Sequence, residues 1–128
     1  MPKKILHIVE SAYRATIEEQ DDTVLWFTHA MKGAGADVSV LLRGNAVNYA
    51  VEGQDASGLS FGARKQTQPP RLDADVAKLA SKGVEVFYIA EDAQARGLQA
   101  TDLIGGPKSL AKNELPGLLA RFDLVFHW

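Results

Sequence analysis

Three short runs of apolar residues limit the fold of this sequence more than any other feature. Residues 4–10 read KILHIVE, residues 36–44 read ADVSVLLRG, and residues 83–90 read GVEVFYIA. Near-continuous apolar strands of this kind are typical of a parallel sheet that is covered on both faces. Segments with helical spacing lie between them, and this alternation predicts an α/β fold. We expect a three-layer α/β/α arrangement with a mainly parallel sheet of about five strands.

The first helix is expected between the first two strands. Asp21 or Asp22 is placed to cap its amino terminus. Thr16 with Glu19 also fits a capping box, which would start the helix one turn earlier. Four apolar residues at helical spacing predict the face that meets the core: Val24, Phe27, Met31 and Ala34.

The opposite face of this helix carries a tryptophan beside two small residues. Trp26, Ala30 and Gly33 lie there at helical spacing. Either another surface packs on this face, or a single exposed aromatic residue is tolerated, and both readings stay open. These three residues are the candidates for a subunit interface.

The rest of the chain contains sequence patterns that predict further helices and strands. The sequence predicts a short helix capped by Asn45, a helix over 73–82 stopped by Gly83, a strand at 110–111, a helix started by Pro116, and a last strand over 123–128. The polar, Gly-rich stretch 53–73 is a long loop, which is uncommon in a compact domain. It is expected to be a lid, an arm that contacts a partner, or a segment with a small helical turn.

Composition excludes several classes of protein. The 128 residues suit a single domain over 1–128. A net charge of −2, without a clustered basic face, gives no case for a nucleic-acid partner. No apolar run approaches the roughly 20 residues of a membrane span. The first apolar run is also too short for a signal peptide, so we expect a cytoplasmic protein.

Residues that could carry chemistry are scarce. The absence of cysteine excludes disulfides, thiolate metal sites and cysteine nucleophiles. The three histidines lie in different elements without ligand spacing, so no metal site or cofactor is expected. His7 is predicted to be a hydrogen-bonded core histidine. Glu91 and Asp92 are predicted to lie in the first turn of a helix, where their negative charge interacts favourably with the helix dipole. Nucleotide-binding and serine-hydrolase motifs are absent, so no catalytic residue is predicted.

The candidate ligand site is a group of residues defined by their position in the predicted sheet and not by a sequence motif. Five residues follow the carboxyl ends of three predicted strands, where ligands bind in open parallel sheets: Ser11, Arg43, Asn45, Ile89 and Ala90. Helix amino termini near Asn45 and Glu91 would direct main-chain N–H groups toward the same crevice. This arrangement favours a small anion.

Three stretches carry a family resemblance: KILHIVESA, GADVSVLLRGNAVNYAVEG and KGVEVFYIAEDAQARGLQATDLIGG. Followed by a Pro-started helix and a last strand, they resemble the DsrE/DsrF-like (DsrEFH) family over nearly the whole chain. The most telling parts are A-x-x-R-G at 93–97 and D-L-I-x-G at 102–106. The resemblance implies one α/β/α domain that assembles as trimers or hexamers, from identical or related subunits. The best-known members act in sulfur oxidation and in the sulfur relay for tRNA thiolation.

The chain departs from this family at its reactive position. In those members a cysteine at the end of the strand after G-V-E carries a persulfide, and counting from Gly83 places that position at Ile89. Without a thiolate there is no persulfide and no thiol exchange. The family includes subunits that lack this cysteine and act as structural partners in hetero-oligomers.

Two functions follow as expectations. The first is a non-catalytic, oligomeric DsrE-like subunit or scaffold in sulfur trafficking. The alternative is a protein or enzyme that binds a small anion through Arg43, Asn45 and the helix termini. If the strand end still suits an anion, a cysteine introduced at position 89 should titrate below the usual value of about 8.5.

Overall fold

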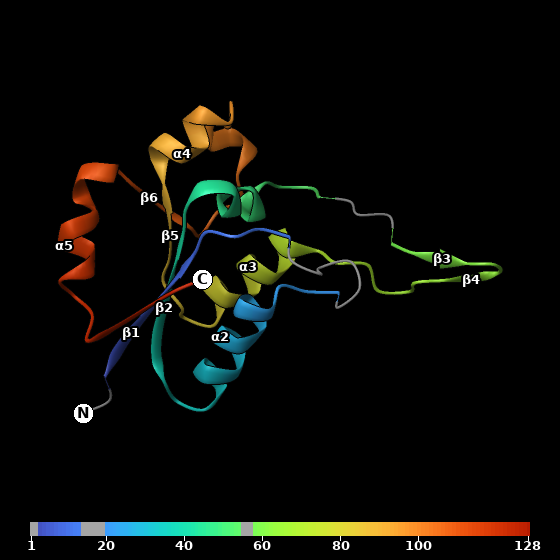
Figure 1. Cartoon of the computed structure of the whole chain (residues 1–128), viewed down its shortest axis with the longest axis horizontal. Helices are drawn as coiled ribbons and strands as arrows, with labels where there is room; N and C mark the ends of the chain where they lie inside the picture. Colours follow the sequence, from blue (N-terminus) through green and yellow to red (C-terminus); the bar gives the residue numbers. More distant parts are fainter. Residues whose placement is uncertain (1–2, 14–19, 55–57) are drawn as a thin grey trace.

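A five-stranded parallel sheet forms the centre of the computed structural model, which describes residues 3–13, 20–54 and 58–128 (Figure 1). Its order is β6-β5-β2-β1-β7, and each neighbouring pair is parallel. The strands are β1 (Lys4–Val9), β2 (Asp37–Leu42), β5 (Val86–Ile89), β6 (Lys108–Leu110) and β7 (Leu124–His127). This confirms the predicted α/β fold.

Helices flank the sheet on both sides (Figure 1). One side carries α2 (Thr23–Gly33), α3 (Leu72–Ser81) and the 3-10 helix η1 (Gly44–Ala50), and the other carries α5 (Leu115–Leu119). The short helix α4 (Ala90–Ala95) follows β5 directly. Two further 3-10 turns are η2 (Ala100–Asp102) and η3 (Lys112–Glu114).

The strands divide their side chains between two apolar clusters, because successive residues of a strand point to opposite faces. The larger cluster lies between the sheet and the elements α2, α3 and η1, and includes Val9, Val40 and Leu42. The smaller cluster lies under α5 and includes Leu6, Leu41 and Ile89. Both faces of the sheet are therefore covered, which explains the near-continuous apolar runs of the central strands.

Most predicted element boundaries hold within one or two residues. Asp22 is the N-cap of α2, and its Oδ1 accepts hydrogen bonds from the N–H groups of Val24 and Leu25 (2.9 and 3.1 Å). The alternative capping box of Thr16 and Glu19 lies outside the described residues. The prediction that Asn45 caps a helix is wrong, since Asn45 lies inside η1, whose first residue is Gly44.

The core-facing side of α2 differs from the prediction. Val24 is buried as predicted, but the other buried residues of the helix are Leu25 and Thr28. Phe27 is 42% exposed, because it lies near the sheet edge, with its ring 5.6 Å from that of His7. The Thr28 hydroxyl is buried but hydrogen-bonded, because it donates to the Val24 carbonyl (2.8 Å).

The long polar stretch contains a β-hairpin in place of the helical turn considered above. The strands β3 (Ser60–Phe61) and β4 (Arg64–Lys65) pair antiparallel. Figure 1 shows this ribbon, which we call the arm, extending away from the sheet and its helices. All four residues of its strands are exposed, and the Phe61 ring is 75% exposed.

Candidate functional site

The carboxyl ends of β1, β2 and β5 lie side by side, as predicted for the candidate ligand site. Arg43, just after β2, forms an ion pair with Glu10, just after β1 (Nε to Oε1, 3.1 Å). The other Glu10 oxygen lies 3.5 Å from Nε2 of His127 at the end of β7. Ser11 is exposed, and its main-chain N–H donates to the carbonyl of Trp128 (3.1 Å). The charge of Arg43 is therefore already balanced within the chain.

One main-chain donor at the start of η1 is also engaged. The Gly44 N–H donates to Oδ2 of Asp92 in α4 (2.7 Å). Asn45 Oδ1 accepts from Nε and Nη2 of Arg96 (3.1 and 2.7 Å), and Arg96 Nη1 also donates to the Asp92 carbonyl (3.0 Å). These contacts join α4 to η1. They give Arg96, in the A-x-x-R-G stretch, a positioning role that the sequence did not reveal.

The two acidic residues that begin α4 do more than complement a helix dipole. Glu91 accepts hydrogen bonds from the Lys112 N–H at both carboxylate oxygens (3.0 and 3.1 Å), so it holds the start of η3. Asp92 holds the start of η1 through Gly44. These two carboxylates therefore occupy the N–H groups of Gly44 and Lys112 at this edge.

Ile89 points away from this group of polar residues. Its side chain is 2% exposed and packs in the cluster under α5 with Leu41 and Leu110. Gly44 and Asn45 belong to η1, which contributes to the cluster on the other face of the sheet. Ala90 lines a separate hollow of about 290 Å³ together with Tyr88 and Ser109. Among the described residues, Ile89 therefore packs on one face of the sheet, while Asn45 belongs to η1 on the other.

A buried tyrosine network was missed by the sequence analysis. The Tyr49 hydroxyl is fully buried in η1, donates to Asp22 Oδ2 (2.7 Å) and accepts from the Tyr13 N–H (2.7 Å). Burial, with a further contribution from the bond to Asp22, raises the pKa of Tyr49 above its usual range. Tyr13 has a φ of 61°, a left-handed conformation that is strained for a bulky residue. The network ties the segment after β1 to the start of α2.

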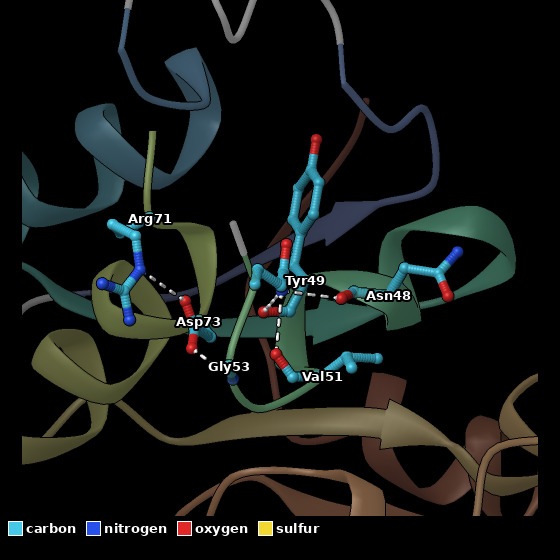
Figure 2. A network of polar contacts seen from close by, with 7 residues as sticks. Asn48, Tyr49, Val51, Gly53, Arg71 and Asp73 are labelled. Atoms are coloured by element: carbon cyan, nitrogen blue, oxygen red, sulfur yellow. Dashed lines mark hydrogen bonds and ion pairs between the residues drawn. The ribbon is translucent and has the colours of Figure 1, made fainter. Parts of the chain in front are cut away.

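A second polar network holds the base of the arm (Figure 2). Asp73 Oδ2 accepts from the Gly53 N–H (2.9 Å), and Asp73 Oδ1 lies 3.6 Å from Nε of Arg71. The Gln54 amide donates to the carbonyls of Asn48, Tyr49 and Val51, at 2.9, 3.0 and 3.0 Å. These bonds satisfy carbonyls at the end of η1, so the base of the arm is fixed although its strands are exposed.

The residues proposed as interface candidates lie on the outer face of α2. Trp26 is 59% exposed, and Ala30 and Gly33 are exposed as well. Trp26 also lines a hollow of about 310 Å³ between α2 and α3, with His29 and Asp75 among its other residues. Burial, then the negative charge of Asp21, raises the pKa of Asp75 to about 6.

His7 is buried as predicted, but it is not hydrogen-bonded. It is fully buried, and neither ring nitrogen has a hydrogen-bond partner among the described residues. Three aromatic rings surround it instead: Phe27, Phe126 and Trp128, with ring centres 5.6, 5.7 and 5.9 Å away. Burial lowers the pKa of His7, which keeps the imidazole neutral near pH 7.

Residues 3–13, 20–54 and 58–128 contain no group of three or more His, Cys, Asp or Glu side chains that could hold a metal ion. Their helices are all too short or too polar to cross a bilayer.

Comparison with known proteins supports the fold. By sequence, the chain matches no family model and no curated protein. By structure, it is similar to the ychN protein from E. coli, with a TM-score of 0.71 and 16% identity over 100% of both chains. It is also similar to MTH1491 from Methanobacterium thermoautotrophicum (TM-score 0.59, 16% identity, 100% of both chains).

A third structure, BT1422 from Bacteroides thetaiotaomicron, aligns with a TM-score of 0.66 and 13% identity over 98% of this chain and 95% of the other. MTH1491 and BT1422 are both described as proteins of unknown function. Sequence identities of 13–16% are low, so the three structures show a shared fold and no shared function.

Proposed function

We propose that this chain is a non-catalytic, DsrE-like subunit that assembles with copies of itself or with related subunits. In this proposal it acts as a structural partner in sulfur trafficking. The observation that carries the proposal is the position of Ile89, where the family resemblance places the persulfide cysteine. This residue is an apolar member of the core, 2% exposed, and no cysteine occurs elsewhere in the sequence.

The polar contacts at the strand ends weigh against the anion-binding alternative. Arg43 is paired with Glu10, Asn45 accepts from Arg96, and the Gly44 N–H donates to Asp92. The charge of Arg43 and the Gly44 N–H, two of the groups that would recognise an anion, are thus already engaged within the chain. The same contacts give α4 a structural role at this edge of the sheet.

Exposed apolar side chains support an assembling subunit. Large exposed hydrophobic residues occur on α2, on the arm and on β7: Trp26, Phe27, Phe61, Leu124, Val125, Phe126 and Trp128. Three of them, Phe27, Phe126 and Trp128, lie together around His7, and an exposed apolar patch on a folded protein commonly marks an interaction site. We expect the protein to form a closed oligomer, a trimer or a hexamer, in which part of this surface is buried.

Light scattering at micromolar concentration tests the proposal. The wild-type chain should have the mass of an oligomer, and Trp26→Glu should lower the average mass because it would bury an unpaired charge. Gln94→Glu, on the exposed surface of α4, is the matched control and should leave the mass unchanged. A wild-type protein that stays monomeric alone and with DsrE-like subunits would contradict the proposed function.

A further inference from the structure

The strand β7 forms an edge of the sheet and lacks the residues that usually protect such an edge from pairing. It pairs with β1 on one side, and no strand in the described part of the chain pairs with its other side. All four of its residues are exposed, including Val125 at 43% and Phe126 at 44%. Natural edge strands are usually guarded by lysine, proline or a bulge, because a bare edge invites pairing with another strand. β7 has no residue of this kind.

The exposed aromatic residues near β7 are continuous with this edge. The register of β7 on β1 places Phe126 beside His7, on the side of the sheet that carries α2. Phe126 and Trp128 stack with ring centres 6.5 Å apart, and Phe27 of α2 contacts the same His7 ring. We call Phe27, Phe126 and Trp128 the edge aromatic surface. Each of its rings is about two-fifths exposed, so the chain by itself leaves the surface partly uncovered.

We propose that β7 pairs antiparallel with β7 of a second copy of this chain about a two-fold axis. The inference rests on the proposed function, since it names the surface through which the subunit assembles. It would join two five-stranded sheets into one continuous sheet and would hide both bare edges at once. An assembly built on this contact has an even number of subunits, as in a hexamer.

The order of residues along β7 suits pairing with itself. With the axis at Phe126, the two Phe126 side chains face each other, and Leu124 faces Trp128 of the second copy on the same side of the sheet. On the other side, Val125 faces His127. The strand carries no acidic or basic residue apart from His127, so no like charges oppose each other across the axis. The β7 strand of a second copy can therefore pair here without the repulsion between like charges that commonly prevents edge strands from pairing with themselves.

Pairing would also place apolar surface against the partly exposed rings that cover His7. The imidazole is buried without a hydrogen-bond partner among the described residues, and its cover consists of the three rings of the edge aromatic surface. Burial of the imidazole without a hydrogen-bond partner costs free energy, and protonation would cost more because the cation would have no acceptor. A second copy of the same surface would supply further apolar contact at this point.

Cysteine cross-linking tests the pairing directly, because the native chain has no cysteine. In the proposed register Val125 of one copy faces His127 of the other. The double variant Val125→Cys/His127→Cys should therefore form a covalent dimer under mild oxidation, with its Cβ atoms within disulfide reach. Each single variant should cross-link much less, since identical positions are then offset diagonally across the axis. Asn113→Cys, exposed in η3, is the control and should stay unlinked.

The outcomes separate this inference from the proposed function. Light scattering on the wild-type chain is expected to give an even number of subunits, and Val125→Lys should reduce that number by placing a charge on the edge. A wild-type trimer, or an oligomer whose folded double variant does not cross-link, would overturn the β7 pairing and leave the proposed function standing. A wild-type chain that remains monomeric alone and with related subunits would overturn both. Cross-linking only to an added extended peptide would assign the edge to another protein.

Discussion

Replacing Ile89 by cysteine asks whether the strand end retains a reactive environment. The sequence suggested a thiol that titrates below about 8.5. The structure reverses this expectation, because the side chain at position 89 is 2% exposed and packs among apolar residues under α5. Burial in apolar surroundings disfavours a thiolate. The carboxylates of Glu91 and Asp92, which are held close by through hydrogen bonds, also oppose a second negative charge.

The size of the effect on stability follows from the burial. Ile89→Cys removes about two carbon-sized groups from the core, at about 0.8 kcal/mol each. The small cavity left behind adds to this loss, so the free energy of unfolding should fall by about 2–3 kcal/mol. Urea unfolding followed by circular dichroism measures this change. The variant is expected to fold, because the cluster under α5 keeps its remaining members.

Alkylation rate against pH measures the thiol itself. The cysteine of the Ile89→Cys variant should react slowly and show a midpoint above about 8.5. Ala95→Cys is the matched control, since Ala95 is exposed at the end of α4, the helix that follows Ile89, and its thiol should react rapidly with a midpoint near the usual value. A midpoint at position 89 below that of the control would refute the reasoning, because it would show a strand end that still stabilises an anion.

Three further changes have defined outcomes. Tyr49→Phe should lower the free energy of unfolding by about 1–3 kcal/mol in urea, since Asp22 Oδ2 then loses its buried donor. Asp75→Asn should raise stability at pH 7: the pKa of Asp75 is about 6 in the folded protein against 3.8 ordinarily, so its contribution falls as pH rises through this window. The gain should shrink toward pH 4 in thermal melts. Limited trypsin digestion should first cut after Arg64 or Lys65, which are exposed on the arm.

The two substitutions have matched controls, and the digestion has a defined contrary outcome. Tyr13→Phe keeps the ring and the main-chain N–H that donates to Tyr49, so it should change stability little. Asp37→Asn, at an exposed position, should show no comparable pH-dependent gain. A stability gain for Asp75→Asn that is constant from pH 4 to pH 7 would contradict the assignment of a raised pKa. First cleavage within the helices would show that the arm is protected, as expected if a neighbouring subunit covers it.

Local sequence patterns were sufficient to predict most of the helices and strands of the fold. The apolar runs at 4–10, 36–44 and 83–90 correctly located β1, β2 and β5, because strands covered on both faces must be apolar along their whole length. Asp22 was one of the two cap candidates for α2, since capping depends on a hydrogen bond to residues only two and three positions away. Gly83, with a φ of 87°, follows α3 where a helix stop was expected.

Periodicity was less successful where a residue's surroundings come from a distant part of the chain. Phe27 has the spacing of a core residue on α2, yet it lies at the sheet edge beside Phe126 and Trp128, about a hundred positions further along the chain. The arm was expected only as a loop of uncertain type, since two-residue strands give almost no alternation to detect.

The candidate site shows most clearly which properties follow from the sequence and which depend on the tertiary structure. The sequence alone determined that no thiol chemistry occurs here and that Arg43, Asn45 and Ile89 follow neighbouring strands. Only the tertiary structure decided that Ile89 turns into the core under α5, while Arg43 and Asn45 are held by Glu10 and Arg96. The physical reason is that the direction of a side chain at a strand end and the partner of a charge depend on groups brought together by folding. A linear pattern records which groups are available, and three-dimensional packing determines which of them meet.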